Sequence, residues 1–284
     1  MKRTLIELTK TREIEYIEPF MVKGSLTAMP SMPRLTDNAE LKPNVSEAEV
    51  DAFINCIDSI SDWIDILIRH VERKLRRYIA IYFSKYRGGK WLENPKLFVR
   101  GKNCYYDCII RILDRLRRHD NICDLSSKDI LRQVYFPELS IIYLRFGNRL
   151  AKKEVAEHFG ILDRIKGESE FSTLDTFCEG IKVLSNYVRN QEAHVNASFR
   201  IIQPMSLCFD TTSMMYPWIS SQCDLGKFYG RTSFLVYITT NFPEFNCQLA
   251  RKEIKRLMGM LPTRVVNYLG IPSKWRNEPM WSRI

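Results

Sequence analysis

One uninterrupted stretch of about forty residues constrains the fold of this chain more than any other feature. Between Ser46 and Tyr86 there is no proline and no glycine, and apolar residues recur at steps of three and four, which is the periodicity of one helix face. Ser46 and Glu49 fit a capping box, and Gly88–Gly89 is a typical helix end. The sequence therefore predicts one very long helix, or two joined by a kink, whose core-facing residues are Val50, Phe53, Ile54, Ile57, Ile60, Ile64, Leu67, Ile68, Val71, Leu75, Ile79 and Phe83.

Shorter segments with the same periodicity cover much of the remaining chain. Helices are predicted at 105–118, at 138–150, at 152–159 and at 249–261, and another is capped by Ser126 or Ser127. The segment Phe234–Thr240 is rich in β-branched residues, which favours a strand by propensity. We nevertheless expect a helix there, because no partner strand with turn residues is evident. The predicted fold class is all-α, a helical bundle.

The N-terminal part of the chain differs from the rest in composition. Pro19, Pro30, Pro33 and Pro43 interrupt it, and proline disfavours regular elements because its ring fixes φ and removes an amide donor. We expect residues 1–44 to form an irregular arm that packs across a helical domain at 45–284.

The charge balance points to an anionic partner. Lysine and arginine number 43 against 33 aspartates and glutamates, which gives a formal net charge of +10, and nucleic acid is the first candidate for such a surface. A merely soluble cationic surface is the alternative. No apolar run of membrane-spanning length and no signal-peptide pattern occur, so we expect a cytoplasmic protein with no membrane partner.

The eight cysteines do not predict a metal site. None lies in a C-x-x-C pattern, and none has a histidine at zinc-finger spacing. Cys104 and Cys108 are four positions apart, but no second pair completes a set of four ligands. We therefore expect reduced thiols, no metal and no cofactor. The remaining histidines have no partner pattern either, and we interpret His70, His119 and His158 as structural.

The candidate catalytic pair is Arg189 with His194. Histidine titrates near neutrality and can move a proton on or off a ribose 2′-hydroxyl, whereas arginine is always charged and its planar fork matches phosphate oxygens. The pair follows a helical stripe of Phe177, Ile181, Leu184 and Val188. By itself the pattern is weak, since a surface arginine bonded to an acid and a histidine packed on the core would look the same.

Four segments, taken together, resemble one family. Residues 71–85 carry E-x-x-L-R, residues 138–161 contain two helical stretches, residues 184–194 end in R-N-x-x-A-H, and residues 268–281 contain two tryptophans. In this order and spacing they resemble the Abi (abortive infection) proteins of the AbiD/AbiF type, within the HEPN superfamily of helical RNA-cleaving domains. Family members commonly have cysteine and histidine at the positions of Glu192 and Val195.

The resemblance implies a HEPN-like helical domain with metal-independent endoribonuclease activity. Single-stranded RNA would be cleaved by attack of its own 2′-hydroxyl, with a toxin-like role in bacterial phage defence. His194 would act as general base or acid, Arg189 would neutralise the scissile phosphate, and Asn190 would orient the substrate or the histidine. The alternative is an RNA-binding protein of the same fold that works with a small structured non-coding RNA or a partner and cleaves little.

Helix geometry bears on how these groups meet. At 100° per residue, Asn190 and His194 lie about 40° apart around a helix, whereas Arg189 and His194 lie about 140° apart. A straight helix therefore aims the two charged groups in different directions. HEPN proteins are known to form dimers in which two motifs share a cleft, and we expect a homodimer with a composite site.

Further candidates accompany the motif. Glu72 and Arg76 are opposite charges at i and i+4, which fits a helix-stabilising ion pair or residues that support the cleft. Basic residues in three helical segments are candidates for gripping the RNA backbone, although such runs are often the solvated side of a helix. The predicted RNA-binding residues are Arg73, Lys74, Arg77, Arg115, Arg118, Arg251 and Lys255.

Overall fold

The computed structural model describes residues 20–23, 40–99, 105–120, 126–159, 174, 177–178, 180–185 and 227–284. Within these ranges the chain is helical and contains no strand, only the isolated bridges Met21–Leu41 and Phe98–Phe146. The predicted all-α fold is therefore confirmed. The main helices are α2 (Glu47–Arg87), α3 (Tyr105–Asp120), α4 (Ser127–Gln133), α5 (Phe136–Arg145), α6 (Arg149–Glu157), α8 (Phe228–Ile238) and α9 (Phe245–Met258).

Short helical pieces complete the described fold. Two 3₁₀ turns, η2 (Trp91–Glu93) and η3 (Pro95–Leu97), lead away from α2, while α10 (Thr263–Val266), η5 (Trp275–Asn277) and α11 (Pro279–Ser282) follow α9. Residues 180–185 are also helical. None of the described helices combines the length and the apolar character needed to cross a membrane.

The long helix α2 is the spine of the molecule. It is one helix of 41 residues, about 60 Å long at 1.5 Å per residue, so the first of the two predicted arrangements is correct. The Ser46 side chain accepts a hydrogen bond from the Glu49 amide, and Gly88 ends the helix with φ of 79°, a conformation that glycine adopts at little cost. Every apolar position predicted to face the core is buried.

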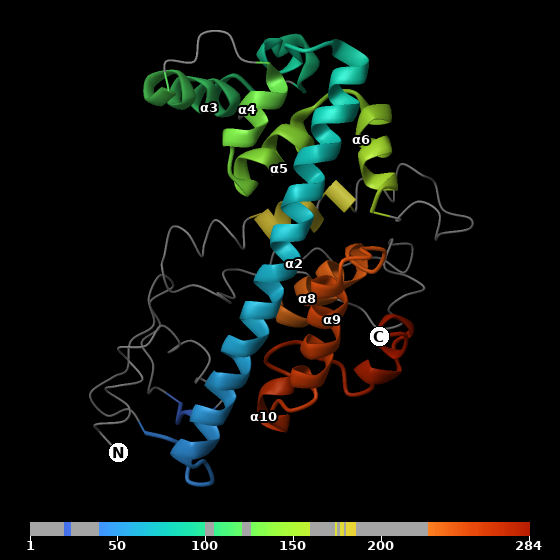
Figure 1. The fold of residues 1–284 in the computed structure, drawn as a ribbon. Coiled ribbons are helices and arrows are strands. Elements are labelled where there is room, and N and C mark those ends of the chain that lie inside the picture. The colour runs from blue at the N-terminus through green and yellow to red at the C-terminus, as the bar shows by residue number, and fades with distance from the viewer. Residues whose placement is uncertain are drawn as a thin grey trace.

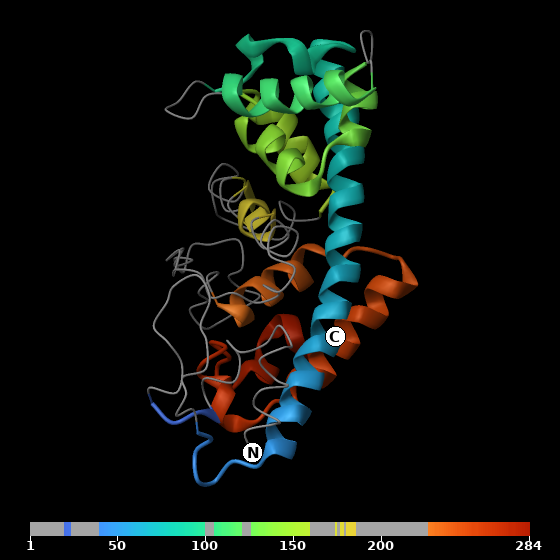
Figure 2. The same cartoon turned by 90° about the vertical axis from the view of Figure 1, so that its left-hand side faces the viewer.

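The other helices pack around the two halves of α2. Figure 1 shows α3, α4, α5 and α6 beside the C-terminal half, and α8, α9 and α10 beside the N-terminal half. The view turned by 90° in Figure 2 shows the same division along the axis of α2. The helices α4, α5, α6, α8 and α9 all contact α2 directly. One long apolar stripe therefore organises a single continuous core.

The helix α8 resolves the ambiguous segment of the sequence. Residues 228–238 form a helix, as we expected, and every one of them except Arg231 is buried. A helix that is buried on all sides has no polar face, so its sequence shows no helical periodicity. That explains why its β-branched residues suggested a strand.

Several helix boundaries differ from the predicted ones, most of all the break between α5 and α6 and the start of α9. The break between α5 and α6 falls at residues 146–148 rather than near 151, because Asn148 caps α6 through the amides of Leu150 and Ala151. Just before it, Phe146 stacks on Phe83 with ring centroids 3.7 Å apart, which ties the end of α5 to α2. The helix α9 begins at Phe245, four residues before the predicted start at Leu249.

Two pieces of the predicted N-terminal arm are described. Phe20 is fully buried and lies against Phe53 of α2, with ring centroids 5.1 Å apart. The amide of Lys42 donates to the carbonyl of Phe20, and the amide of Val22 donates to that of Glu40. These residues cover the first turns of α2, and the rest of residues 1–39 lies outside the described part of the chain.

Candidate functional site

The predicted catalytic residues Arg189, Asn190 and His194 lie outside the described residues, as do Glu192 and Val195. Their mutual geometry and the composite dimer site therefore remain predictions. What the structure does describe is the helical segment that leads into the motif, the supporting pair on α2, and most of the predicted basic residues.

The segment before the motif is anchored in the core. Ile181 and Leu184 are buried, as the predicted stripe requires, and Phe177 packs against Tyr143 of α5 with ring centroids 5.9 Å apart. The hydroxyl of Ser185 is 2.8 Å from that of Ser140 on α5. Leu184 also lines a small apolar cavity with residues of α2 and α8, namely Ile64, Ile68, Phe228 and Leu235. The motif thus follows a helix that contacts three others.

Glu72 and Arg76 form the ion pair that their spacing predicted. Arg76 does more, since its Nε donates to the carbonyl of Leu131 at 2.9 Å and its Nη2 donates to the carbonyl of Val134 at 2.8 Å. These carbonyls belong to the C-terminal end of α4, where a cation is favoured by the helix dipole. The pair therefore joins α2 to α4, and its role beside a cleft stays a prediction.

Three of the predicted RNA-binding residues are engaged with carboxylates or carbonyls elsewhere in the protein. Lys74 pairs with Glu244 at 3.2 Å, and Arg115 pairs with Glu138 at 2.7 Å. Arg251 is only 7% exposed, and its Nη1 donates to the carbonyl of Thr239 at the end of α8. The prediction that Arg251 grips the RNA backbone is wrong for this geometry, because a buried guanidinium bonded to a helix end cannot reach a phosphate in solvent.

The remaining basic residues of α2 form an exposed row. Arg73 and Arg77 are exposed, and Arg69, one turn earlier, is exposed as well. We call Arg69, Arg73 and Arg77 the arginine stripe. No carboxylate of the described residues pairs with any of its members, and the same holds for exposed Arg118 on α3 and half-buried Lys255 on α9. Arg69 was missed in the sequence, although its i−4 spacing from Arg73 is a usable signal.

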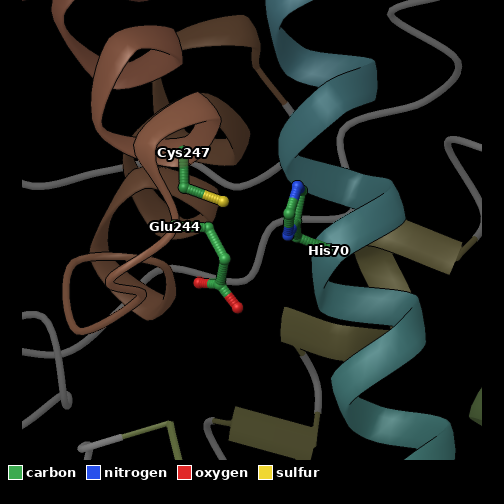
Figure 3. Close-up of side chains that lie close together, drawn as sticks. All are labelled: His70, Glu244 and Cys247. Atoms are coloured by element: carbon green, nitrogen blue, oxygen red, sulfur yellow. The ribbon is translucent and has the colours of Figure 1, made fainter.

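A second cluster lies where α2 meets the start of α9. Figure 3 shows His70 on α2 facing Glu244 and Cys247 across the helix interface. One donor atom from each of the three residues can be chosen so that all lie within 4.8 Å of one another. Arg73 Nη2 lies 2.9 Å from His70 Nδ1. The sequence did not predict this cluster, because His70 lies far from the other two residues along the chain.

The environment sets the protonation of the cluster. Burial, helped by Arg73, lowers the pKa of His70 below its usual value, and burial raises the pKa of Cys247 to about 11. Burial of Glu244 opposes ionisation, but its backbone hydrogen bond and Lys74 outweigh that effect and lower its pKa. At neutral pH the cluster therefore holds a neutral imidazole, a thiol and a carboxylate.

His158 fits the structural role expected for it. Its ring stacks on Tyr78 with centroids 4.1 Å apart and forms a hydrogen bond with the hydroxyl of Tyr82. Both tyrosines belong to α2, so the contact attaches the end of α6 to the spine.

Comparisons with known proteins find no family model, no curated protein and no solved structure that matches this chain. The resemblance to the Abi proteins therefore rests on the four sequence segments described above. The function that follows from it is a proposal.

Proposed function

We propose that this chain is an RNA-binding, metal-independent endoribonuclease whose catalytic residues are Arg189, Asn190 and His194. Its role in this proposal is toxin-like action in bacterial phage defence, in the cytoplasm. The sequence resemblance supplies the reaction class, and the net charge of +10 supports a polyanionic substrate.

The arginine stripe is the observation that carries the proposal. Residues four apart on a helix are separated by a rise of about 6 Å, so Arg69, Arg73 and Arg77 present one guanidinium per turn along about 12 Å of α2. A row of cations without acidic partners in the described structure suits the repeating charge of a phosphate backbone better than a helix surface balanced by ion pairs.

In the sequence, the stripe begins next to a residue of α2 that lies near the segment leading into the motif. Arg69 directly follows Ile68, which lines the same cavity as Leu184, and Arg189 follows Leu184 by five residues. Five residues of fully extended chain span at most about 18 Å. The same turn of α2 therefore carries a core contact to the segment leading into the motif, through Ile68, and the first cation of the stripe, through exposed Arg69.

The proposed reaction requires no metal. One imidazole removes the proton of the 2′-hydroxyl, and the 2′-oxygen attacks the adjacent phosphorus while Arg189 neutralises the growing charge on the phosphoryl oxygens. The bond to the 5′-oxygen breaks, and that oxygen takes a proton from an imidazolium. The products are a 2′,3′-cyclic phosphate and a 5′-hydroxyl. One His194 ring can serve both steps, because the imidazolium that it forms on taking the 2′-hydroxyl proton can return that proton to the 5′-oxygen.

An RNA cleavage assay in excess chelator tests the proposal. The purified chain should cut single-stranded RNA and leave a 2′,3′-cyclic phosphate, and His194→Ala should reduce the rate by at least about 100-fold, as expected for loss of general acid–base catalysis. His158→Phe is the matched control, because it removes an imidazole that packs on α2 and should leave cleavage unchanged. Equal cleavage by wild type and His194→Ala would contradict the proposal. RNA bound equally by both chains with no cleavage would favour the RNA-binding alternative.

A further inference from the structure

We propose that His70, Glu244 and Cys247 bind a zinc ion, or a divalent transition metal of similar preference, between α2 and the start of α9. The set offers one nitrogen, one carboxylate oxygen and one sulfur, all of which are donors that zinc accepts in proteins. This site is separate from the proposed cleavage chemistry and does not depend on it.

The separation of the donors is close to what a metal requires. Zinc binds sulfur at about 2.3 Å, and nitrogen or oxygen at about 2.0 to 2.2 Å, so tetrahedral ligands lie roughly 3.4 to 3.6 Å apart. In the structure the three donor atoms all lie within 4.8 Å of one another. Closing the site therefore needs movements of about 1 Å or less per side chain. The glutamate and imidazole are half-buried and at the edge of the interface, where side-chain rotation allows such a movement.

An unsatisfied carboxylate oxygen is the second observation that points to a ligand. Glu244 Oε1 pairs with Lys74 at 3.2 Å. The other oxygen, Oε2, is buried and has no hydrogen-bond partner in the described structure. A buried acceptor without a partner is costly. Figure 3 shows Glu244 on the same side of the interface as Cys247, with His70 of α2 on the other side. A bound cation would satisfy that oxygen.

The charges around the cluster decide how a metal binds. Zinc takes the place of the Cys247 thiol proton, which is released to solvent, and the resulting thiolate and the Glu244 carboxylate balance the two charges of the ion. Arg73 donates to His70 Nδ1, so the proton of the neutral ring is on Nε2. For the ring to bind metal, Arg73 must give up this contact. Arg73, which bonds to His70, and Lys74, which pairs with Glu244, therefore compete with the ion for these two ligands. Because Cys247 must release its proton when the metal binds, the affinity for the metal should rise with pH.

Three protein ligands leave a fourth position open for water. Structural zinc sites generally have four protein ligands, and three with an open position is the arrangement of sites that accept an exogenous ligand. The Cys247 sulfur is buried, whereas the imidazole and carboxylate are half-buried, so the open position faces the partly exposed side of the interface. A metal held there would also cross-link α2 to the first turn of α9.

Cobalt titration of the full chain tests the proposal. The reduced protein is freed of metal with chelator and titrated with Co²⁺, which develops a near-ultraviolet thiolate charge-transfer band when a cysteine coordinates it. We expect one equivalent to bind and zinc to displace it. Cys247→Ser should remove the band. His70→Gln and Glu244→Gln should each weaken binding by more than about 10-fold, because even the loss of a group that only orients a metal ligand costs about 10- to 100-fold.

Matched variants separate coordination from folding. Cys56→Ser removes a different buried thiol, one that donates to the carbonyl of Leu257, and should leave the titration unchanged. Arg73→Gln removes the competing donor and should tighten binding by about fivefold, the effect of one unit charge nearby in water. At equal zinc concentration, zinc should raise the Tm of wild type and of Cys56→Ser by more than that of Glu244→Gln.

Two results would overturn the proposal. One is the absence of a stoichiometric Co²⁺ complex in wild type, and the other is an unchanged band in Cys247→Ser. If Cys247→Ser does not fold, the other two variants decide. Binding of Co²⁺ with wild-type affinity by both His70→Gln and Glu244→Gln would also overturn the proposal. None of these results bears on RNA cleavage, which is assayed in chelator.

Discussion

Arg76 of α2 holds the carbonyl of Val134, the residue that ends α4, at a distance of 2.8 Å from its Nη2. Arg251 of α9 makes the corresponding contact with the carbonyl of Thr239 at the end of α8. In both places a cation from one helix satisfies the free carbonyls at the C-terminus of another, where the helix dipole favours positive charge. Two of the basic residues first considered for the functional site are therefore used to join helices.

Removing the Arg76 contact should destabilise the fold. Arg76→Met loses three hydrogen bonds from a charged donor, one to Glu72 and two to carbonyls at the end of α4. We expect the free energy of unfolding to fall by about 2 kcal/mol. Neighbouring Arg77→Met, on the exposed face, should change it by less than about 0.5 kcal/mol. Urea unfolding measures both, and equal effects of the two substitutions would contradict the assignment.

The arginine stripe should set the salt dependence of RNA binding. Replacing Arg69, Arg73 and Arg77 together with glutamine should weaken binding and lower the slope of log K against log salt by about 2, because each phosphate contact to single-stranded RNA contributes about 0.7. The control removes the same charge at arginines that already pair with acids, namely Arg117, Arg132 and Arg256. A slope that changes equally in both triple variants would show that net charge alone matters.

The contact between the helical segment at residues 180–185 and α8 predicts an effect at Gly180. A Cβ added there would lie 2.0 Å from the buried ring of Phe234, so Gly180→Ala should cost about 2 to 3 kcal/mol through overpacking. Gly89→Ala, which meets no atom within 4 Å, should be within about 0.5 kcal/mol of wild type. Thermal unfolding distinguishes them. If Gly180→Ala is as stable as Gly89→Ala, the packing of this helix against α8 is incorrect.

The Lys74–Glu244 pair predicts a pH dependence of stability. The pKa of Glu244 is lowered in the folded protein, so the folded state favours the carboxylate. This contribution is present above the unfolded pKa of about 4.3 and is lost as pH falls through the folded pKa. The pair is partly exposed, so we expect less than about 1 kcal/mol. Between pH 6 and pH 3, the free energy of unfolding should fall more in wild type than in Glu244→Gln. A larger fall in the variant would mean that ionised Glu244 destabilises the fold, which is the opposite of this prediction.

The composite site predicts complementation between two inactive chains. Arg189→Ala and His194→Ala should each be inactive as homodimers. Mixed dimers bring one intact arginine and one intact histidine together across the shared cleft, and they should regain cleavage of the RNA substrate. The amount of mixed dimer is measured with differently tagged chains. If mixed dimers form and remain inactive, the simple trans-complementing version of the site is wrong.

Much of the fold could be predicted because α2 is amphipathic along its whole length. Its buried residues from Val50 to Phe83 recur with helical spacing, and Ser46 and Gly88 mark its ends. The prediction was less certain where burial surrounds an element, as in α8, and less accurate at the break between α5 and α6. There, the boundary depends on Asn148 and on the tertiary contact of Phe146 with Phe83.

One of the two candidate sites could be found from the sequence, and the other could be found only from the structure. The Arg189–His194 motif was found from sequence because its members are neighbours in the chain, and its geometry is still a prediction. The His70–Glu244–Cys247 cluster has no local pattern, since α2 supplies one member and the start of α9 supplies the other two. Only the packing of these two helices brings the three side chains together.

The sequence by itself determined the helical class, the length of α2 and the apolar face that it buries, because these depend on spacing along one chain segment. The tertiary structure decided what each charged residue does. Arg76 and Arg251 donate hydrogen bonds to carbonyls at the C-terminal ends of other helices. Lys74 and Arg115 pair with carboxylates that are distant in the sequence. The side chains of Arg69, Arg73 and Arg77 remain exposed. The physical reason is that a charge has no fixed role until packing determines which carbonyl, carboxylate or solvent lies within about 3 Å of it.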